Sequence, residues 1–237
     1  VSCLEGEYQL SLAFDGQEGI DKALEEIPDL IISDVMMPKR DGFDLCNTLK
    51  LEKRTSHIPI ILLTAKADAD SRITGLERGA NAYLAKPFDQ RELKAQLRNL
   101  FALRQSLQAR YADLEDLKPS KEPELEQEDI FVLNVKDLVL QNLDDLDYDL
   151  NALSKALHLS RSQLGRKLKA LTGNSPGVFI RTIRLQEAKR LLLTTDRTVK
   201  EIAYDVGFSS HNYFTNSYTA AFNESPSDTR QAGNPLT

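Results

Sequence analysis

The sequence predicts two domains of different class, an α/β domain with a doubly wound parallel sheet and an all-α domain. In the first half, short apolar segments alternate with segments of helical periodicity, which is the pattern of strands joined by crossover helices. In the second half, apolar residues recur only at helical spacing. We expect the first domain to cover residues 1–117 and the helical domain to cover residues 130–237. An acidic, proline-containing linker over residues 118–129 separates them, because its composition offers too little apolar surface to fold.

Charge is distributed unevenly along the chain. Residues 111–150 contain 3 Lys/Arg against 13 Asp/Glu, whereas residues 151–237 contain 12 Lys/Arg against 6 Asp/Glu. Only the last part is therefore suited to bind a polyanion. The 2 cysteines have no metal-type spacing, and no apolar run is long enough to span a bilayer. We expect a cytoplasmic chain that makes no membrane contact.

The elements of the first domain follow from periodicity and turn residues. An Ile-rich apolar run ends at Asp34 and is cut off by Pro38, as expected of a strand buried on both faces of a parallel sheet. Gly79 ends one helix, and Asp89 caps another that runs past residue 100. The remaining expected elements are strands over residues 8–14, 59–63 and 82–85 and helices over residues 17–26, 43–53 and 68–78.

Three side chains of different chemistry follow three successive strands, namely Asp34, Thr64 and Lys86. Because the carboxyl ends of parallel strands meet at one edge of a sheet, we expect these side chains to converge on one crevice. A carboxylate can attack phosphorus to give an acyl phosphate, and a hydroxyl and an ammonium can then hold the added charge. Taken singly, each residue has a structural explanation as a cap, a turn residue or a solvated charge. Together they favour phosphoryl transfer.

The helical domain contains a two-helix unit twice. In the first unit, Asp149 caps a helix, and the next helix begins at a capping box of Ser160 and Gln163. The second unit begins at a capping box of Thr198 and Glu201. Its second helix spans residues 209–222 and is expected to turn four aromatic side chains inward, those of Tyr213, Phe214, Tyr218 and Phe222.

A helix over residues 130–143 precedes both units, and a helix over residues 176–193 joins them. The joining helix is 18 residues long, which is about 27 Å. Such a rod can hold two helices near the roughly 34 Å repeat of the DNA major groove. The helix after Ser160 carries arginine and glutamine, which pair bidentately with guanine and adenine edges, although a basic helix face is often only solvated. This outer face is expected to hold Arg161, Ser162, Gln163, Arg166, Lys167 and Lys169.

Residues 8 to about 110 resemble the receiver domain of two-component response regulators. The matching motifs are the run over residues 31–38 followed by Asp41-Gly42, the run over residues 60–65, and the stretch from Gly79 to Phe88. The resemblance implies a flavodoxin-like fold. It also implies a role for each of several residues: Asp34 as phosphoacceptor, Lys86 paired with the phosphoryl group, Thr64 hydrogen-bonded to it, Tyr83 turned inward behind Thr64, a cis peptide before Pro87, and Mg²⁺ bound by Asp34 and the backbone carbonyl of Met36.

The chain departs from the receiver pattern at its front. The family's first strand, and the acidic pair at its end that holds Mg²⁺, are absent from the residues that precede Asp34. We therefore expect a sheet whose first strand is missing and a domain that is incomplete at the front. For want of metal ligands, this chain by itself is expected to be phosphorylated poorly.

Residues 130–232 resemble the AraC/XylS-type DNA-binding domain, with two helix-turn-helix units. The match rests on residues 160–164 and 166–173, on Ser175-Pro176 to Arg181 with Arg184-Leu185, on residues 202–208, and on Tyr213-Phe214 and Ser225-Pro226. The resemblance implies one recognition helix in each unit. The expected DNA-binding residues are Arg161, Ser162, Gln163, Arg166, Lys167 and Arg181 in the first part and Ser210, His211, Asn212 and Asn216 in the second.

Together the resemblances imply a sequence-specific DNA-binding transcription regulator controlled by phosphorylation of Asp34 in a two-component phosphorelay. The expected partners are double-stranded DNA, a histidine kinase or a kinase domain upstream in the same polypeptide, and a second copy of the chain once phosphorylated. Alternatively, the receiver is a passive platform for dimerisation or partner binding. An enzyme is not expected. A phosphatase of the haloacid dehalogenase type needs a second acidic residue two positions after its nucleophile, and the corresponding position here is Met36.

Overall fold

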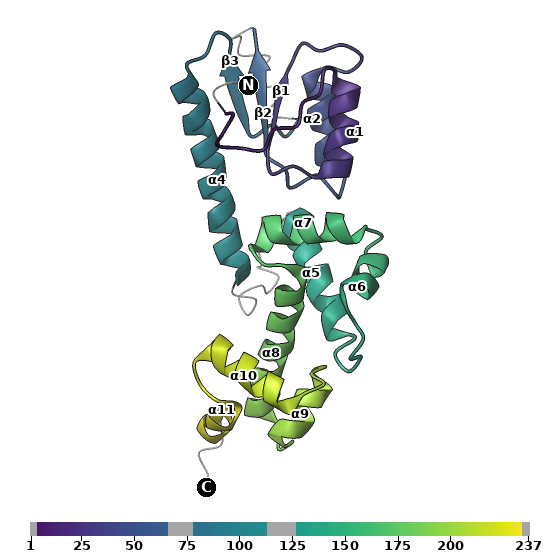
Figure 1. The fold of residues 1–237 in the computed structure, drawn as a ribbon, viewed down its shortest axis with the longest axis vertical. Helices are drawn as coiled ribbons and strands as arrows, with labels where there is room; N and C mark the ends of the chain where they lie inside the picture. The colour runs from purple at the N-terminus through teal and green to yellow at the C-terminus, as the bar shows by residue number, and fades with distance from the viewer. Residues whose placement is uncertain (1–3, 66–77, 113–126, 234–237) are drawn as a thin grey trace. The chain divides into compact units, whose positions relative to one another are not determined.

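The structure is a computed structural model that describes residues 4–65, 78–112 and 127–233 (Figure 1). Contacts between residues divide the chain into two compact units, Val1–Ala109 and Arg110–Thr237. The first unit is α/β and the second is all-helical, as the sequence predicts. Each unit has its own core.

The sheet of the first unit has three parallel strands in the order β1-β2-β3. The central strand β2 is the most deeply buried, because Ile60, Ile61 and Leu62 are fully excluded from solvent. Strands predicted at these three places are confirmed. Their bounds are β1 Ile31–Asp34, β2 Ile60–Thr64 and β3 Ala82–Ala85.

The prediction of a strand over residues 8–14 is wrong. No strand is assigned to this segment, and its apolar side chains are exposed, with Leu12 at 49% and Phe14 at 82% exposure. A strand depends on hydrogen bonds to a neighbour, and among the described residues this segment makes only an isolated bridge between Tyr8 and Glu5. The segment is instead held near its two ends, where the Tyr8 ring stacks 6.1 Å from that of Phe101 and the Phe14 N–H donates to Glu18 Oε2 over 2.9 Å.

Helices cover both faces of the sheet, which confirms the doubly wound arrangement. On one face, Ile20 of α1 and Leu49 of α2 pack against Ile60 and Leu62, whose side chains point to the same side of β2. On the other face, residues of α4 pack against Ile61 (Figure 1). The bounds are α1 Gly16–Glu26, α2 Gly42–Leu51 and α4 Gln90–Ala112. The helix expected over residues 68–78 lies outside the described residues, apart from its last residue.

The second unit contains two helix pairs, α6–α7 and α9–α10, that flank the long helix α8, together with α5 before the first pair and α11 after the second (Figure 1). Helix α5 begins at Gln127, so three residues expected in the linker are helical, and it ends at Leu140 rather than at Leu143. The rest of that linker lies outside the described residues. The bounds are α5 Gln127–Leu140, α6 Leu150–Ala156, α7 Arg161–Thr172, α8 Pro176–Thr194, α9 Val199–Asp205, α10 His211–Phe222 and α11 Pro226–Gly233.

Both predicted capping boxes are formed, and they fix where α7 and α9 begin. The backbone N–H of Gln163 donates to Ser160 Oγ over 3.2 Å, and the Ser160 N–H donates to Gln163 Oε1 over 3.0 Å. Thr198 and Glu201 make the same reciprocal pair of bonds before α9. Each box satisfies N–H groups that have no partner within the helix.

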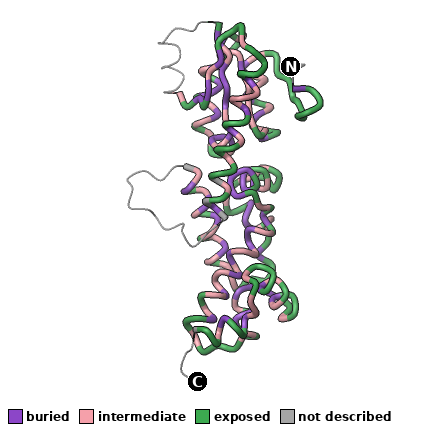
Figure 2. Tube along the Cα trace, turned by 90° about the vertical axis from the view of Figure 1, so that its left-hand side faces the viewer, coloured by how far each residue is buried: buried purple, intermediate pink, exposed green. Residues whose placement is uncertain are grey.

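The core of the second helix pair is aromatic. Phe214 and Tyr218 of α10 are fully buried against Leu192 of α8 and Ile202 of α9. Tyr213 does not join them, because it is 52% exposed, and its predicted inward position is wrong. Figure 2 shows buried positions along the inner sides of the helices and exposed positions outside them.

Candidate functional sites

The Asp34 carboxylate lies at the carboxyl end of β1 and forms an ion pair with the Lys86 ammonium, which follows β3. Its other oxygen, Oδ1, accepts a hydrogen bond of 3.2 Å from the Met36 N–H. The Asp34 and Lys86 side chains are 34% and 39% exposed. The acid is therefore accessible from solvent and already faces a cation.

Thr64 ends the strand that lies between those of Asp34 and Lys86. It is opposite Ala85 in the register, and its carbonyl accepts a hydrogen bond of 2.7 Å from the Lys86 N–H. The side chain is buried, with 5% exposure. The structure thus brings all three residues to one edge of the sheet, while their roles in phosphoryl transfer stay predictions.

The loop after Asp34 is pinned to the start of α2. Gly42 donates its N–H to the Val35 carbonyl over 2.9 Å, and a Cβ at Gly42 would lie only 2.3 Å from the Asp34 carbonyl oxygen. Asp41 caps α2, with its Oδ1 accepting 2.7 Å from the Asp44 N–H. Only glycine lets the helix approach the strand end this closely.

Tyr83 turns toward the α1–α2 side of the sheet and packs against the core there. Its hydroxyl is buried and has no hydrogen-bond partner among the described residues. Burial, and to a smaller extent the nearby Cys46, raise the pKa of Tyr83 to about 12, with Arg78 acting in the opposite direction. The peptide between Lys86 and Pro87 is cis, as the resemblance implies.

A magnesium ion needs six oxygen ligands in near-octahedral geometry, some of them water. The expected protein donors are an Asp34 oxygen and the Met36 carbonyl, and Asp34 is paired with Lys86. No group of three or more His, Cys, Asp or Glu side chains in the described part of the chain could hold a metal. Asp15 is committed elsewhere, to Lys39 and to the α1 cap. The described residues therefore do not fit a complete magnesium site.

Helix α7 presents most of the residues expected to read DNA. Arg161, Ser162 and Arg166 are exposed. Gln163 is half-buried, and its amide oxygen accepts a hydrogen bond within the capping box. The helix thus offers two guanidinium groups, a hydroxyl and an amide on its outer side.

Lys167 does not lie with them. It is 2% exposed, and its ammonium lies 4.5 Å from the centroid of the Phe131 ring of α5. Position 167 is three residues after Leu164 and four before Leu171, both buried, so it belongs to the inner face. The prediction that Lys167 lies on the outer face and contacts DNA, which rested on its basic side chain, is therefore wrong as to the face.

Helix α10 presents Asn212 and Asn216 on its exposed side, with His211 half-buried and Ser210 exposed before it. Ser210 also caps the helix, since its Oγ accepts a hydrogen bond of 3.3 Å from the Tyr213 N–H. The helix contains no Lys or Arg. It therefore offers hydrogen-bonding groups without the charge that α7 supplies.

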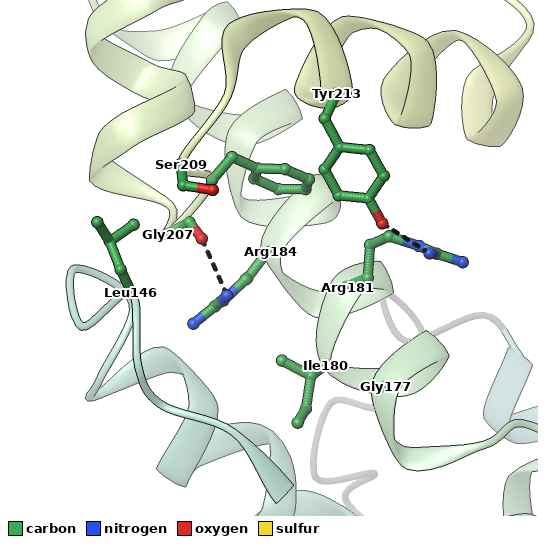
Figure 3. Close-up of a pocket in the computed structure, with 9 residues that line it drawn as sticks. Leu146, Gly177, Ile180, Arg181, Arg184, Gly207, Ser209 and Tyr213 are labelled. Carbon is green, nitrogen blue, oxygen red and sulfur yellow. Dashed lines mark hydrogen bonds between the residues drawn. The ribbon is translucent and has the colours of Figure 1, made fainter.

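A cavity of about 280 Å³ lies between α8 and the second helix pair (Figure 3). Arg181 donates to the Tyr213 hydroxyl over 3.0 Å and lowers the pKa of Tyr213. Arg184 points to the other side and donates to the Gly207 carbonyl over 3.0 Å. No role for Arg184 or for the Tyr213 hydroxyl is predictable from the sequence, because the segments that meet here are remote along the chain.

Two family models match the chain. One, described as the response regulator receiver domain, matches residues 2–98, and the other, described as a helix-turn-helix domain, matches residues 153–232. No helix in the described ranges has the length and apolar character needed to cross a membrane.

Individual relatives match the whole chain or one part of it. Histidine kinase P4 of Formosa agariphila is 35% identical over 224 residues, which are 94% of this chain and 16% of that protein. The probable transcriptional regulator ycf27 of Cyanophora paradoxa is 48% identical over 93 residues, 39% of this chain and 38% of that protein. The chain thus spans well under half the length of either relative.

Among solved structures, the receiver domain of sensor histidine kinase PA1611 from Pseudomonas aeruginosa, with magnesium coordinated in its active site cleft, is 31% identical. It covers 43% of this chain and 84% of its own, with a TM-score of 0.40.

Proposed function

The chain is a response regulator receiver domain followed by a helix-turn-helix domain of the AraC type, and from this we propose that it is a sequence-specific transcription regulator switched by phosphorylation of Asp34. The observation that carries the proposal is the Asp34–Lys86 ion pair at the sheet edge of a chain that also holds two helix-turn-helix units. In this proposal the receiver domain accepts a phosphoryl group, and the helix-turn-helix domain binds DNA.

The chemistry of the switch follows from the groups at the sheet edge. An Asp34 oxygen attacks the phosphorus of a phosphohistidine, the new O–P bond gives an acyl phosphate, and the histidine nitrogen leaves with the P–N electron pair. Lys86 would then pair with the phosphoryl oxygens, and Thr64 would donate its hydroxyl to them. A magnesium ion would neutralise further charge, but it would need donors beyond Asp34 and Met36.

The arrangement of the second unit supports binding of double-stranded DNA. Helices α7 and α10 are the second helices of the two helix-turn-helix units, which lie on either side of α8 along the chain. Helix α8 has 19 residues and is therefore about 28 Å long. This length is near the roughly 34 Å repeat of the major groove, so that one chain can reach two successive grooves. The base-contacting residues would be Arg161, Ser162, Gln163 and Arg166 in α7 and Ser210, His211, Asn212 and Asn216 at α10, with Arg181 on a phosphate.

The expected partners follow from the proposed phosphorylation of Asp34. Phosphorylation requires a histidine kinase, either separate or in the same polypeptide, and the relative named histidine kinase P4 aligns with 94% of this chain. We further propose that the phosphorylated receiver forms a homodimer, which raises DNA affinity by bringing two DNA-binding domains together. Such a regulator would act in the cytoplasm.

A second candidate is that the receiver is a passive dimerisation platform. The small number of magnesium donors among the described residues favours it, because a receiver that cannot be phosphorylated still presents its surface. An Asp34→Ala variant separates the two. In cells, loss of promoter regulation supports the switch, whereas unchanged regulation at equal protein level supports the platform.

DNA binding is tested by footprinting the 237-residue chain on a duplex selected from a random library, at two salt concentrations. We expect a protected site that spans two successive major grooves on one face of the duplex, and an affinity that falls steeply with salt. A protected region of a single groove, or no sequence selection, would contradict the proposal.

A further inference from the structure

Arg184, near the middle of α8, makes hydrogen bonds to backbone on both sides of that helix. Its Nη1 donates to the Gly207 carbonyl over 3.0 Å, in the turn of the second helix-turn-helix unit (Figure 3). Its Nη2 donates to the Asp145 carbonyl over 3.0 Å and lies 3.5 Å from the Tyr148 carbonyl. Asp145 and Tyr148 belong to the segment that leads from α5 into α6, the first helix of the other unit. One guanidinium group therefore ties together backbone from both units.

Close contact of the same segments supports this link. Gly207 has a φ of +80°, and a Cβ placed on it would lie 2.5 Å from the Leu143 carbonyl and 2.7 Å from Arg184 Cζ. The turn of the second unit thus touches the segment after α5 directly, at a position where only glycine fits. The contact leaves no room for the turn to move closer, and the guanidinium hydrogen bonds keep it from moving away.

The bonds of Arg184 to the Gly207 and Tyr148 carbonyls are partly buried, whereas the bond to the Asp145 carbonyl is exposed. The side chain is half-buried, Nε is buried without a hydrogen-bond partner among the described residues, and burial lowers the pKa of Arg184. A guanidinium remains protonated at neutral pH even so, and its planar fork fits several carbonyls at fixed angles. Most of its hydrogen-bonding capacity is thus spent on holding backbone rather than on reaching solvent or DNA.

We propose that Arg184 is a positioning residue that fixes the angle between the two helix-turn-helix units, so that DNA binding depends on the spacing between two half-sites. The spacing dependence rests on the proposed DNA-binding function. The fixed angle does not, since it is a property of the free protein. Two experiments therefore address the two parts separately.

The first experiment measures, in the absence of DNA, the distance between one label in each helix-turn-helix unit, which varies when the angle between the units varies. Nitroxide labels are placed at Lys169→Cys in α7 and Thr219→Cys in α10, both exposed, in a Cys3→Ser, Cys46→Ala background. Double electron–electron resonance should give one narrow distance distribution. Arg184→Met removes all five N–H donors but keeps a long side chain, and it should broaden the distribution about twofold.

Arg190→Met is the matched control. Arg190 lies on the same helix, but its guanidinium bonds to Glu187 within α8, so the distribution should stay narrow. If Arg184→Met gave the same width as Arg190→Met, the inference would be wrong. Should Arg184→Met fail to fold, Gly207→Ala takes its place, because the added methyl group pushes the turn away from Leu143 and Arg184.

The second experiment measures binding of the full chain to the library-selected duplex and to versions with two base pairs inserted between its half-sites. For the unsubstituted chain and for Arg190→Met, we expect the insertion to weaken binding about tenfold or more, as a lost set of base contacts would. For Arg184→Met, binding to the selected duplex weakens, and the insertion changes it by less than about threefold.

The outcomes separate the two proposals. A broadened distribution together with no sequence-selective binding by any variant contradicts the DNA-binding function and leaves the positioning role supported. Equal spacing dependence in Arg184→Met and Arg190→Met contradicts the positioning role and leaves the DNA-binding function supported.

Discussion

The ion pair between Lys86 and Asp34 crosses the carboxyl end of β2, a strand that contains neither residue. The two lie at the ends of β3 and β1, and β2 runs between these strands. Two strand spacings amount to about 9.5 Å, which the long lysine side chain bridges over Thr64. The phosphoryl group that we propose for Asp34 would therefore lie within reach of the Lys86 ammonium.

The 237-residue chain should be labelled only weakly by a small phosphodonor such as acetyl phosphate, and added Mg²⁺ should change this little. The reason is that two oxygen donors do not hold the metal. Asp34→Asn should abolish the residual label, and Lys86→Met should reduce it, as measured by intact-protein mass spectrometry. Asp41→Asn is the control, because asparagine caps a helix as well as aspartate does, and its label should persist. Strong Mg²⁺-dependent labelling would refute the metal argument.

Replacing Tyr83 with Phe should not destabilise the first unit at pH 7. The buried hydroxyl has no partner among the described residues, so its removal relieves a desolvation cost and should change the free energy of unfolding by about 0 to +1 kcal/mol. Tyr218→Phe is the contrasting variant. Its hydroxyl donates to Thr229 Oγ1 over 3.0 Å, and losing that bond should cost about 0.5–1.5 kcal/mol. Urea denaturation measures both.

Tyr83 also predicts a pH dependence. Its pKa is about 12 in the folded chain, against 10.0 for an ordinary tyrosine, so the unfolded chain loses this proton first. The stability contributed by protonated Tyr83 is therefore complete below pH 10 and is lost as the pH rises through about 12. Tyr83→Phe should make the alkaline loss of stability of the first unit shallower. An unchanged alkaline profile would contradict the assignment.

Arg166 and Lys167 are adjacent in sequence and should behave differently. Arg166→Met should weaken binding to the selected duplex by about 1–3 kcal/mol if it contacts a base. Lys167→Met should leave the affinity and its salt dependence unchanged while lowering the stability of the second unit, because this ammonium lies over Phe131 inside the fold. Fluorescence anisotropy across a salt series makes the comparison. A lower salt slope for Lys167→Met would mean that this lysine reaches a phosphate.

Gly165→Ala should stabilise the second unit by about 0.5–1 kcal/mol, since glycine in a helix interior is unfavourable by that amount. The new methyl group meets nothing closer than Pro176 Cγ at 3.9 Å. Gly42→Ala should destabilise the first unit, because its methyl group would lie 2.3 Å from the Asp34 carbonyl oxygen. Thermal unfolding of both variants tests the pair, and a Gly165→Ala chain that melts earlier would contradict the prediction.

The sequence by itself determined the elements whose signals are local. The three strands, the capping boxes at Ser160 and Thr198, and the convergence of Asp34, Thr64 and Lys86 on one edge were all predictable. Hydrophobic period, caps and turn residues act over a few positions, and strand ends in a parallel sheet meet at one edge whatever the details of packing.

Tertiary structure alone decided which neighbours each segment has. Residues 8–14 have the composition of a strand, but no strand in the described part of the chain pairs with them. Lys167 has a basic side chain at an inward position, and the Tyr213 hydroxyl accepts a hydrogen bond from Arg181. Arg184 reaches Gly207 and Asp145, which lie 23 and 39 residues away along the chain. Contacts of this kind depend on the packing of whole helices, because each side chain's environment is set by segments that the local pattern does not encode.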